Sequence, residues 1–343
     1  MELAKRLSPG PAALLIGAAA LAACSPVYVA KSAAGHASLL ARRRPIAKAL
    51  RDPKTPPELR RRLSLVEDAR RFAFDRLGLK RSRDYSSFVL KKGPLSFVVS
   101  GSEKLKLKPV LWNFPLVGRF PYKGHFKLKD AKREKAKLEK KGLDAFIAGA
   151  AAYNTPLWFA DPIPSSALED STGTVAGLII HELAHGTVFY KNQMSFNEAA
   201  ASFIGQQGAT QYLVERFGPE SAELKAFEEE SRREAAFEAE LVALRVEREK
   251  LYASGLPNEA KLAERERLFT ASRAKIVALG LDVPELNNAA VLAYSVYRGD
   301  LPLMRRAVER SGRDWPRFLA LLKALDERDP SGDLTSSIAP GRR

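Results

Sequence analysis

The sequence predicts an α+β protein that is mostly helical, with a small antiparallel sheet and a long helical hairpin. Short apolar runs punctuated by Gly and Pro over residues 85–126 predict the strands. After residue 172, apolar residues recur at helical spacing almost to the C-terminus. Two charged helical segments, 219–251 and 258–279, are joined by a Ser-Gly-Leu-Pro-Asn turn, which predicts the hairpin.

The remaining elements follow in chain order. Residues 45–79 carry apolar side chains at three-to-four spacing among arginines, which predicts surface-packed helices. Residues 127–141 predict a charged helix that Gly142 ends, the small apolar run 145–153 predicts a strand, and 161–166 predict a loop. In the hairpin, a narrow apolar stripe suits packing of the two helices against each other. We interpret the charged residues of the hairpin as a face exposed to solvent. The alternative is that the hairpin is an arm that binds a partner.

Composition excludes several classes of protein. The 343 residues include 17 Phe, 9 Tyr and 3 Trp, enough apolar surface to exclude wholesale disorder. A single Cys excludes an intrachain disulfide scaffold. The 56 Lys and Arg against 40 Asp and Glu give a formal charge of +16, which favours anionic surroundings such as nucleic acid, phospholipid headgroups or cell-wall polymer without choosing among them.

The N-terminus has the pattern of an export signal. Lys5 and Arg6 precede an apolar run over residues 12–23, which is too short to span a bilayer but suits a secretory signal peptide. Cys24 directly follows Leu-Ala-Ala, as in the lipobox of bacterial lipoproteins. We therefore expect a lipid on Cys24 and a periplasm-facing protein in a bacterial cell envelope. Because Ser25 is not Asp, an outer-membrane anchor is favoured over an inner one. The alternative is a plain signal peptide or a buried helix.

The chemistry is concentrated in His181-Glu182-Leu-Ala-His185, which ends an apolar helical run. Burying two imidazoles and a carboxylate is costly unless they are paired or bound to a metal. Residues four apart lie on one helical face, so His181 and His185 can hold one Zn²⁺ ion, and Glu182 can take a proton from a zinc-bound water. The alternative is two satisfied core histidines.

Zinc needs a third protein ligand, and Glu198 is the candidate. It follows a short loop and begins a second apolar helix, which returns antiparallel to the first. A competing interpretation is a capping box, Ser195-x-x-Glu198, in which the carboxylate merely accepts from a backbone donor. His36 and His125 are weaker ligand candidates, because each is isolated in sequence.

These residues resemble the gluzincin pattern, in which a downstream Asn-Glu motif provides the glutamate ligand. The match is closer to the predicted zinc aminopeptidase family of bacterial lipoproteins and extends over most of the chain, apart from the long hairpin. It includes the lipobox, the zinc motif, and four further groups of residues: 114–118 with 121–124, 152–155 with 158–162, 287–289, and Tyr297. His125 and Asn154 depart from the expected residue types, and neither belongs to the zinc motif.

The resemblance implies a gluzincin-like metalloprotease core and aminopeptidase activity on a peptide substrate. In gluzincins, a strand beside the active-site helix pairs with the substrate backbone, and 145–153 is the candidate here. A donor to the developing oxyanion is also required, with Tyr297 as first choice and Tyr294 as second. No acidic cluster near 146–160 suits capture of a substrate ammonium group, so an endopeptidase remains an alternative.

The expected organisation is a signal peptide, 1–23, followed by a single catalytic domain, 24–343. That domain comprises a strand-rich part (84–165), zinc-binding helices (170–218), the helical hairpin (219–281), C-terminal helices (284–328) and a flexible tail (329–343). A non-enzymatic cell-envelope scaffold with structural zinc is the second alternative. Nucleic-acid binding is not expected, because the positive charge is spread along the chain, and the sequence does not set the oligomeric state.

Overall fold

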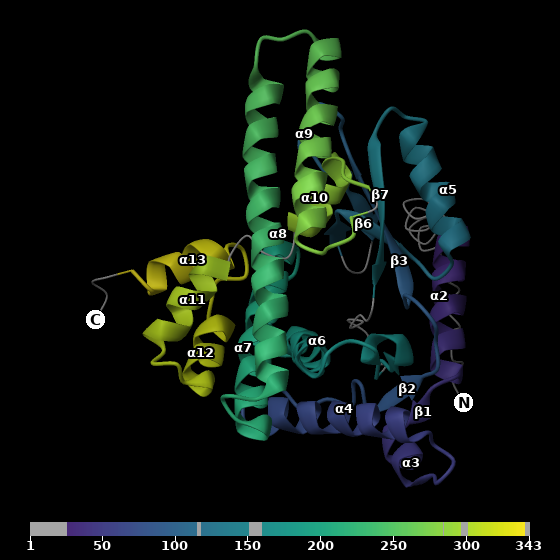
Figure 1. Cartoon of the computed structure of the whole chain (residues 1–343), viewed down its shortest axis with the longest axis vertical. Helices are drawn as coiled ribbons and strands as arrows, with labels where there is room; N and C mark the ends of the chain where they lie inside the picture. Colours follow the sequence, from purple (N-terminus) through teal and green to yellow (C-terminus); the bar gives the residue numbers. More distant parts are fainter. Residues whose placement is uncertain (1–25, 115–117, 151–159, 284, 296–300, 340–343) are drawn as a thin grey trace, which may run out of the picture.

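Helices form most of the computed structural model, which describes residues 26–114, 118–150, 160–283, 285–295 and 301–339 (Figure 1). The α-helices are α2 (Pro26–Ala41), α3 (Ile46–Arg51), α4 (Pro57–Asp75), α5 (Leu128–Glu139), α6 (Thr172–His185), α7 (Met194–Phe217), α8 (Ala222–Ala253), α9 (Asn258–Ala278), α10 (Asn288–Ser295), α11 (Leu301–Arg310), α12 (Trp315–Lys323) and α13 (Pro330–Ser337). A 3₁₀ turn, η1, spans Ser165–Leu168.

The strands are short and form three small sheets. They are β1 (Arg44–Pro45), β2 (Ser87–Val89), β3 (Ser96–Ser102), β4 (Trp112–Phe114), β5 (Gly118–Phe120), β6 (Tyr122–His125), β7 (Asp144–Ala150) and β8 (Ile163–Pro164). The sheets have the orders β1-β2-β8, β6-β3-β7 and β4-β5. The predicted fold class, mostly helical α+β, is confirmed.

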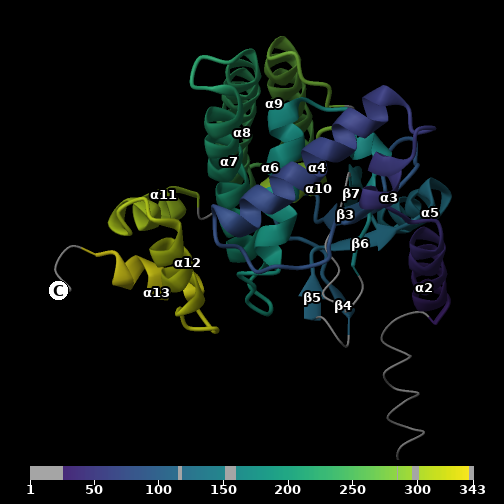
Figure 2. The same cartoon turned by 90° about the horizontal axis from the view of Figure 1, so that it is seen from below.

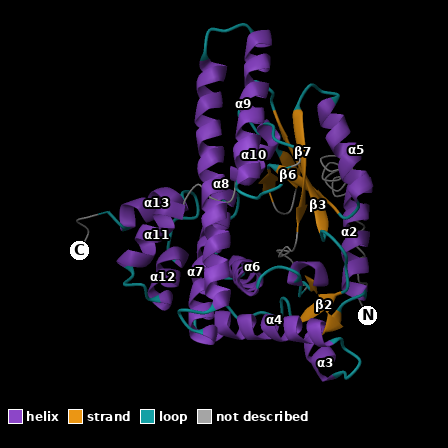
Figure 3. Cartoon of the chain, in the orientation of Figure 1, coloured by secondary structure: helices purple, strands orange, loops and turns teal. Residues whose placement is uncertain are grey.

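The β6-β3-β7 sheet separates a helix from a cavity. Both strand pairings are antiparallel, and Val98 of β3 lies opposite Gly124 of β6 and Ala148 of β7. Because side chains alternate along a strand, Val99 and its neighbours on one face pack under α5, while Val98 and its neighbours face the cavity. Figure 3 shows these strands between α5 and α10. The strand predicted at 145–153 is observed as β7, and residues 151–153 lie outside the described residues.

One sheet differs from the antiparallel arrangement that the sequence predicts. Strand β2 pairs with β8 in parallel, with Phe88 opposite Ile163, so that prediction was wrong here. Residues 161–166, expected as a loop, contain β8 and the start of η1. A parallel pair needs a long crossover connection, and the chain between these two strands holds the entire β6-β3-β7 sheet.

The main hydrophobic core surrounds α6. Helices α4 and α7 pack on it, and the core includes Val66 of α4, Ile180 of α6 and Ile204 of α7, all fully buried. Helices α6 and α7 approach closely where Gly205 faces Gly177. A Cβ at position 205 would lie 2.9 Å from the Gly177 carbonyl oxygen and 3.0 Å from His181 Cβ. A larger residue at 205 would therefore displace the helix that carries the histidines.

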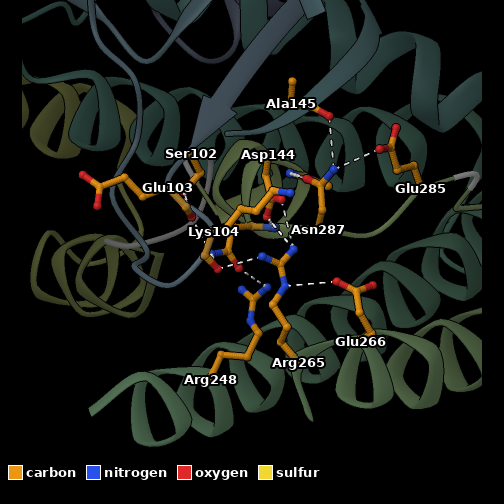
Figure 4. A network of polar contacts seen from close by, with 12 residues as sticks. Ser102, Glu103, Lys104, Asp144, Ala145, Arg248, Arg265, Glu266, Glu285 and Asn287 are labelled. Atoms are coloured by element: carbon orange, nitrogen blue, oxygen red, sulfur yellow. Dashed lines mark hydrogen bonds and ion pairs between the residues drawn. The ribbon is translucent and has the colours of Figure 1, made fainter. Parts of the chain in front are cut away.

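The predicted hairpin is observed as α8 and α9, and a buried polar network joins it to the sheet (Figure 4). Arg265 of α9 donates to both carboxylate oxygens of Asp144, at 3.0 and 2.8 Å. Arg248 of α8 donates to Asn288 Oδ1 at 2.8 Å, and the Asn288 backbone amide donates to Asp144 at 3.0 Å. The start of β7, the start of α10 and both helices of the hairpin are thereby fixed to one another.

The C-terminal segment corrects one expectation. Residues 329–343 were predicted to be flexible, but Pro330–Ser337 form α13, and residues 340–343 lie outside the described part of the chain. Asp329 Oδ1 accepts from the Gly332 amide at 2.9 Å, and Leu334 is fully buried in the main core. A side-chain cap and one buried leucine hold a segment of polar composition in a helix. Both views place α11–α13 on the side of the molecule away from α2 and α5 (Figure 1 and Figure 2).

The proposed export signal lies outside the described residues. Residues 1–25, including Cys24, are not described, and α2 begins at Pro26. Among the residues that are described, no helix has the length and apolarity needed to cross a membrane.

Candidate active site

Helix α6 places the histidine motif in the protein interior. Ser171 caps its N-terminus by accepting from the Thr174 amide at 3.2 Å, and Ser171 and Thr174 both donate to Glu230 of α8 at 2.7 Å. Most of its apolar residues are buried, so the helix is inside the core as predicted. His185 is its last residue. The motif therefore lies in the last two turns, with the carbonyl end of the helix nearby.

An asparagine fixes the loop between α6 and α7. Asn197 Oδ1 accepts from the Tyr190 amide at 2.8 Å, and Asn197 Nδ2 donates to the Tyr190 carbonyl at 2.7 Å. Tyr190 is itself held by its hydroxyl, which donates to the Leu322 carbonyl at 2.5 Å. This clamp sets the return of the chain from α6 into α7 and so sets the position of Glu198, the next residue.

The two histidines and Glu198 meet between α6 and α7. His181 Nε2 lies 3.2 Å from His185 Nε2, and Glu198 Oε2 lies 3.5 and 3.7 Å from these two nitrogens. A tetrahedral zinc ion with bonds of about 2.0 to 2.2 Å needs ligand atoms about 3.3 to 3.6 Å apart. The three side chains therefore fit a metal ion of this size, and they form a group of ligand atoms within 4.8 Å of one another.

The capping-box interpretation of Glu198 does not hold. Helix α7 begins at Met194, and its N-cap residue is Gln193, whose side chain makes no capping bond. Ser195 therefore lies inside the helix, where it cannot cap it. The Glu198 carboxylate faces the two imidazoles instead. The metal-ligand role of Glu198 stays a prediction that this geometry supports.

Glu182 lies beside the ligand group and is buried. Burial raises the pKa of Glu182 to about 7. The neighbouring carboxylates of Glu198 and Asp161 add to this rise, while His181 and a hydrogen bond from the Tyr85 hydroxyl oppose it. A carboxyl group with a pKa near neutrality can both accept and return a proton, as a general base must. Tyr85 is fully buried and holds the carboxyl group in place.

The pKa shifts of His185 and Glu198 suit the binding of a cation. Burial, with the nearby His181, lowers the pKa of His185 to about 4, so its imidazole is neutral at physiological pH and can donate an electron pair. Burial acts to raise the pKa of Glu198, but a hydrogen bond from His181 and electrostatic interactions with both imidazoles outweigh it, so this pKa lies below its usual value. The group thus offers two nitrogen ligands and one anionic oxygen.

The site opens into a cavity of about 1920 Å³. Its walls come from α2, from the face of the β6-β3-β7 sheet opposite α5, and from α6, α7 and α10. On α2, the residues facing it recur at helical spacing: Tyr28, Ser32, Ala33, His36, Ala37 and Leu40. This volume exceeds the roughly 300 to 1,000 Å³ typical of small-ligand pockets, and it suits a chain of several residues.

Of the remaining predicted site residues, three line the cavity and one lies outside the described residues. Tyr297 lies outside the described residues. Tyr294 lines the cavity and packs on Phe146 and Phe237, with ring centroids 5.6 and 5.1 Å away. His36 and His125 also line the cavity, but the metal-ligand group found among the described residues does not include them.

Sequence reasoning missed Tyr85 and the clamp made by Asn197. Tyr85 is about a hundred residues from Glu182, and no local pattern marks it, although its positive φ of 57° is unusual for a bulky residue. Asn197 was noticed as half of the Asn-Glu pair, but its bonds to Tyr190 could not be read from spacing.

Comparison with known proteins identifies a family for this chain. A search of curated proteins found no match, and a search of solved structures also found none. A family model described as "putative aminopeptidase" matches residues 27–333, which is most of the chain and includes the whole ligand group. The match supports a peptidase-like function, and the chain belongs to this putative aminopeptidase family.

Proposed function

We propose that the protein is a zinc-dependent peptidase whose catalytic domain spans residues 24–343, and that it acts as an aminopeptidase. The observation that carries this is the convergence of His181, His185 and Glu198 on a common point, with the buried carboxyl group of Glu182 beside them in a large cavity. The family description adds the aminopeptidase assignment.

Each residue has a distinct part in the proposed reaction. A zinc ion held by His181, His185 and Glu198 would supply Lewis-acid chemistry by polarising the peptide carbonyl and acidifying a water. Glu182 takes the proton of the attacking water and passes it to the leaving amine. Tyr85 holds the Glu182 carboxyl group in one orientation. Tyr294 or Tyr297 would donate to the developing oxyanion.

The ligand count favours catalysis over a structural metal. Structural zinc sites are usually closed by four protein ligands, whereas catalytic sites keep one position for water or substrate. The group found among the described residues has three members. A cell-envelope scaffold with structural zinc, the non-enzymatic alternative, would need a fourth protein ligand.

The choice between aminopeptidase and endopeptidase depends on recognition of the substrate N-terminus. Among the described residues that line the cavity, the acidic ones are Glu182 and Glu198, which already have other roles. An aminopeptidase would need a further carboxylate, or one of these two, for the substrate ammonium group. Digestion of a peptide library with free and with acetylated N-termini tests this. Cleavage confined to free N-termini supports the aminopeptidase, and equal cleavage of both supports an endopeptidase.

We also propose that the protein is anchored through a lipid on Cys24, in the cell envelope and facing the periplasm, with the outer membrane favoured. The support is the sequence pattern Leu-Ala-Ala-Cys and the basic charge of the chain. Its partners are then the membrane and a peptide substrate, and no nucleic acid. Cys24→Ser should release the protein from membranes or leave its precursor unprocessed. An unmodified protein that begins elsewhere would contradict the anchor.

A further inference from the structure

We propose that the cavity face of the β6-β3-β7 sheet is a binding site for a large, uncharged apolar side chain of the peptide substrate, and that Gly124, Val98 and Ala148 form its base. This inference rests on the proposed peptidase function, because it assigns a substrate class to that site.

The base of this site is a row of small side chains across three strands. Gly124 of β6 and Ala148 of β7 lie directly opposite Val98 of β3, on either side of it, and all three line the cavity. A Cβ built on Gly124 would meet nothing within 4 Å. Directly opposed residues on a sheet face are the closest neighbours there, so three small residues in one row leave a depression that a ligand group can fill.

One adjoining row carries two aromatic side chains and limits the depression, whereas the other row is also small and extends it. On one side Ser100 lies opposite Tyr122 and Phe146, and on the other side Ser96 lies opposite Ala150. Phe146 is packed against Tyr294 of α10, which closes that end. Leu292 of α10 also lines the cavity, and it is half-buried. An apolar side chain on the row 124–98–148 would therefore also meet an apolar wall.

The positions of the charged side chains in the cavity disfavour a charged substrate side chain on the row of Gly124, Val98 and Ala148. The charged side chains among its described lining are Glu182 and Glu198 at the metal-ligand group and Arg119, which is exposed, on β5. A Lys or Asp side chain placed on the small-residue row would lose water without gaining a partner there, which costs free energy. A Leu or Phe side chain would gain free energy from leaving water. The geometry thus favours peptides with a large apolar residue at the position that reaches this row.

The test uses the zinc-loaded full chain and quenched peptides of one length, with Ala, Leu, Phe, Lys or Asp in turn at each position. We expect kcat/KM for Leu or Phe at one position of the peptide to exceed that for Ala, Lys or Asp by roughly tenfold or more, the effect of one or two methylenes in an apolar pocket. Gly124→Leu should fill the depression and lower kcat/KM for the Leu and Phe peptides until the preference over the Ala peptide is lost.

Two further variants separate the site from effects on folding. Gly255, at the turn between α8 and α9, also has open space around its Cβ position and does not line the cavity, so Gly255→Leu should behave as the wild type. Val98→Ala should deepen the depression and shift the preference toward Trp. If Gly124→Leu does not fold, a preference that Val98→Ala leaves unchanged overturns the inference.

The outcomes distinguish the two proposals. Hydrolysis without side-chain preference, or with a preference that Gly124→Leu does not alter, overturns the apolar site and leaves the peptidase intact. If no peptide is cleaved, the proposed peptidase function fails, and the apolar site is then tested by peptide binding alone. Fluorescence anisotropy of the labelled Phe peptide with metal-free protein should show binding that Gly124→Leu weakens at least roughly tenfold. Equal binding by both proteins would overturn the site.

Discussion

Two buried polar clusters in this protein differ in the partners that their polar groups have. In the cluster of Asp144, Arg265 and Asn288, carboxylate and carbonyl oxygens meet N–H donors from α9 and α10 at 2.7 to 3.0 Å. In the cluster of His181, His185 and Glu198, two imidazole nitrogens and a carboxylate oxygen converge, and the three groups together could hold a metal ion. The carboxylate of the first cluster has ion-pair and hydrogen-bond partners within the protein, whereas the second cluster has the composition of a ligand set.

Because of this difference, we expect the first cluster to stabilise the fold and the second cluster to serve the function. Removing one member of a buried ion pair destabilises the native state, because the remaining charge is left buried without a partner. A ligand set contributes its free energy when the ion is bound, because a cation that binds the native state shifts the folding equilibrium toward it. Changes in the first cluster should therefore affect unfolding, and changes in the second should affect metal content.

The largest effect on stability is expected for Asp144→Asn. The substitution leaves the buried guanidinium group of Arg265 without its buried carboxylate partner, so the free energy of unfolding should fall by about 3 to 5 kcal/mol. Zinc bound per folded chain should not change. Chemical denaturation and metal analysis of the same preparation measure both quantities.

A matched control tests the role of burial. Arg265 also contacts Glu266 at 3.2 Å, and the Glu266 side chain is 68% exposed. Glu266→Gln removes a carboxylate from the same guanidinium group but should cost less than about 1 kcal/mol. Equal losses for Asp144→Asn and Glu266→Gln would contradict the distinction between the buried network and the surface.

The opposite outcome is expected for Glu198→Ala. Removing this carboxylate takes away one of three ligands, so zinc affinity should fall by more than the roughly 10- to 100-fold typical of losing a group that only supports a ligand. The unfolding of the metal-free protein should change little. Glu198→Gln keeps the size of the side chain and should also bind zinc weakly. Stoichiometric zinc in purified Glu198→Ala would require a different third ligand.

A smaller effect is expected for Asn197→Ala, which alters the support of the site and not the ligand set. Its two bonds to the Tyr190 backbone are buried, so their loss should cost about 1 to 3 kcal/mol of unfolding free energy. Zinc affinity should fall by roughly 10- to 100-fold, because Glu198 follows in the chain. Asn258→Ala, at the exposed start of α9, is the control and should leave zinc affinity unchanged. Unchanged affinity in Asn197→Ala would remove its positioning role.

Local patterns in the sequence predicted much of the fold. The Ser-Gly-Leu-Pro-Asn turn predicted the α8–α9 hairpin, and the spacing of His181 and His185 predicted their common helical face, because both features depend on residues a few positions apart. The strand β7 was also predicted, although its run of alanines suits a helix equally well.

Features that depend on distant residues were not predictable in this way. The parallel pairing of β2 with β8, the bond from Tyr85 to Glu182 and the ion pair of Asp144 with Arg265 each join segments more than 70 residues apart. The helix at Pro330–Ser337 was missed because its composition is polar, and its stability comes from burial of Leu334 in a core assembled elsewhere. Residues 287–288 were singled out by resemblance, and the structure gives them a role in the network that orients α10.

Glu182 is proposed to act on the proton and not on the metal. Glu182→Gln keeps the size of the side chain and removes the base, so zinc per chain should stay at the wild-type level while peptide turnover falls at least roughly 100-fold. His181→Ala should instead lose zinc and turnover together. The decisive measurement is zinc content and turnover on the same preparation of Glu182→Gln. Full zinc with greatly reduced turnover is the predicted result, and unchanged turnover would contradict the account and leave a structural metal as the better explanation.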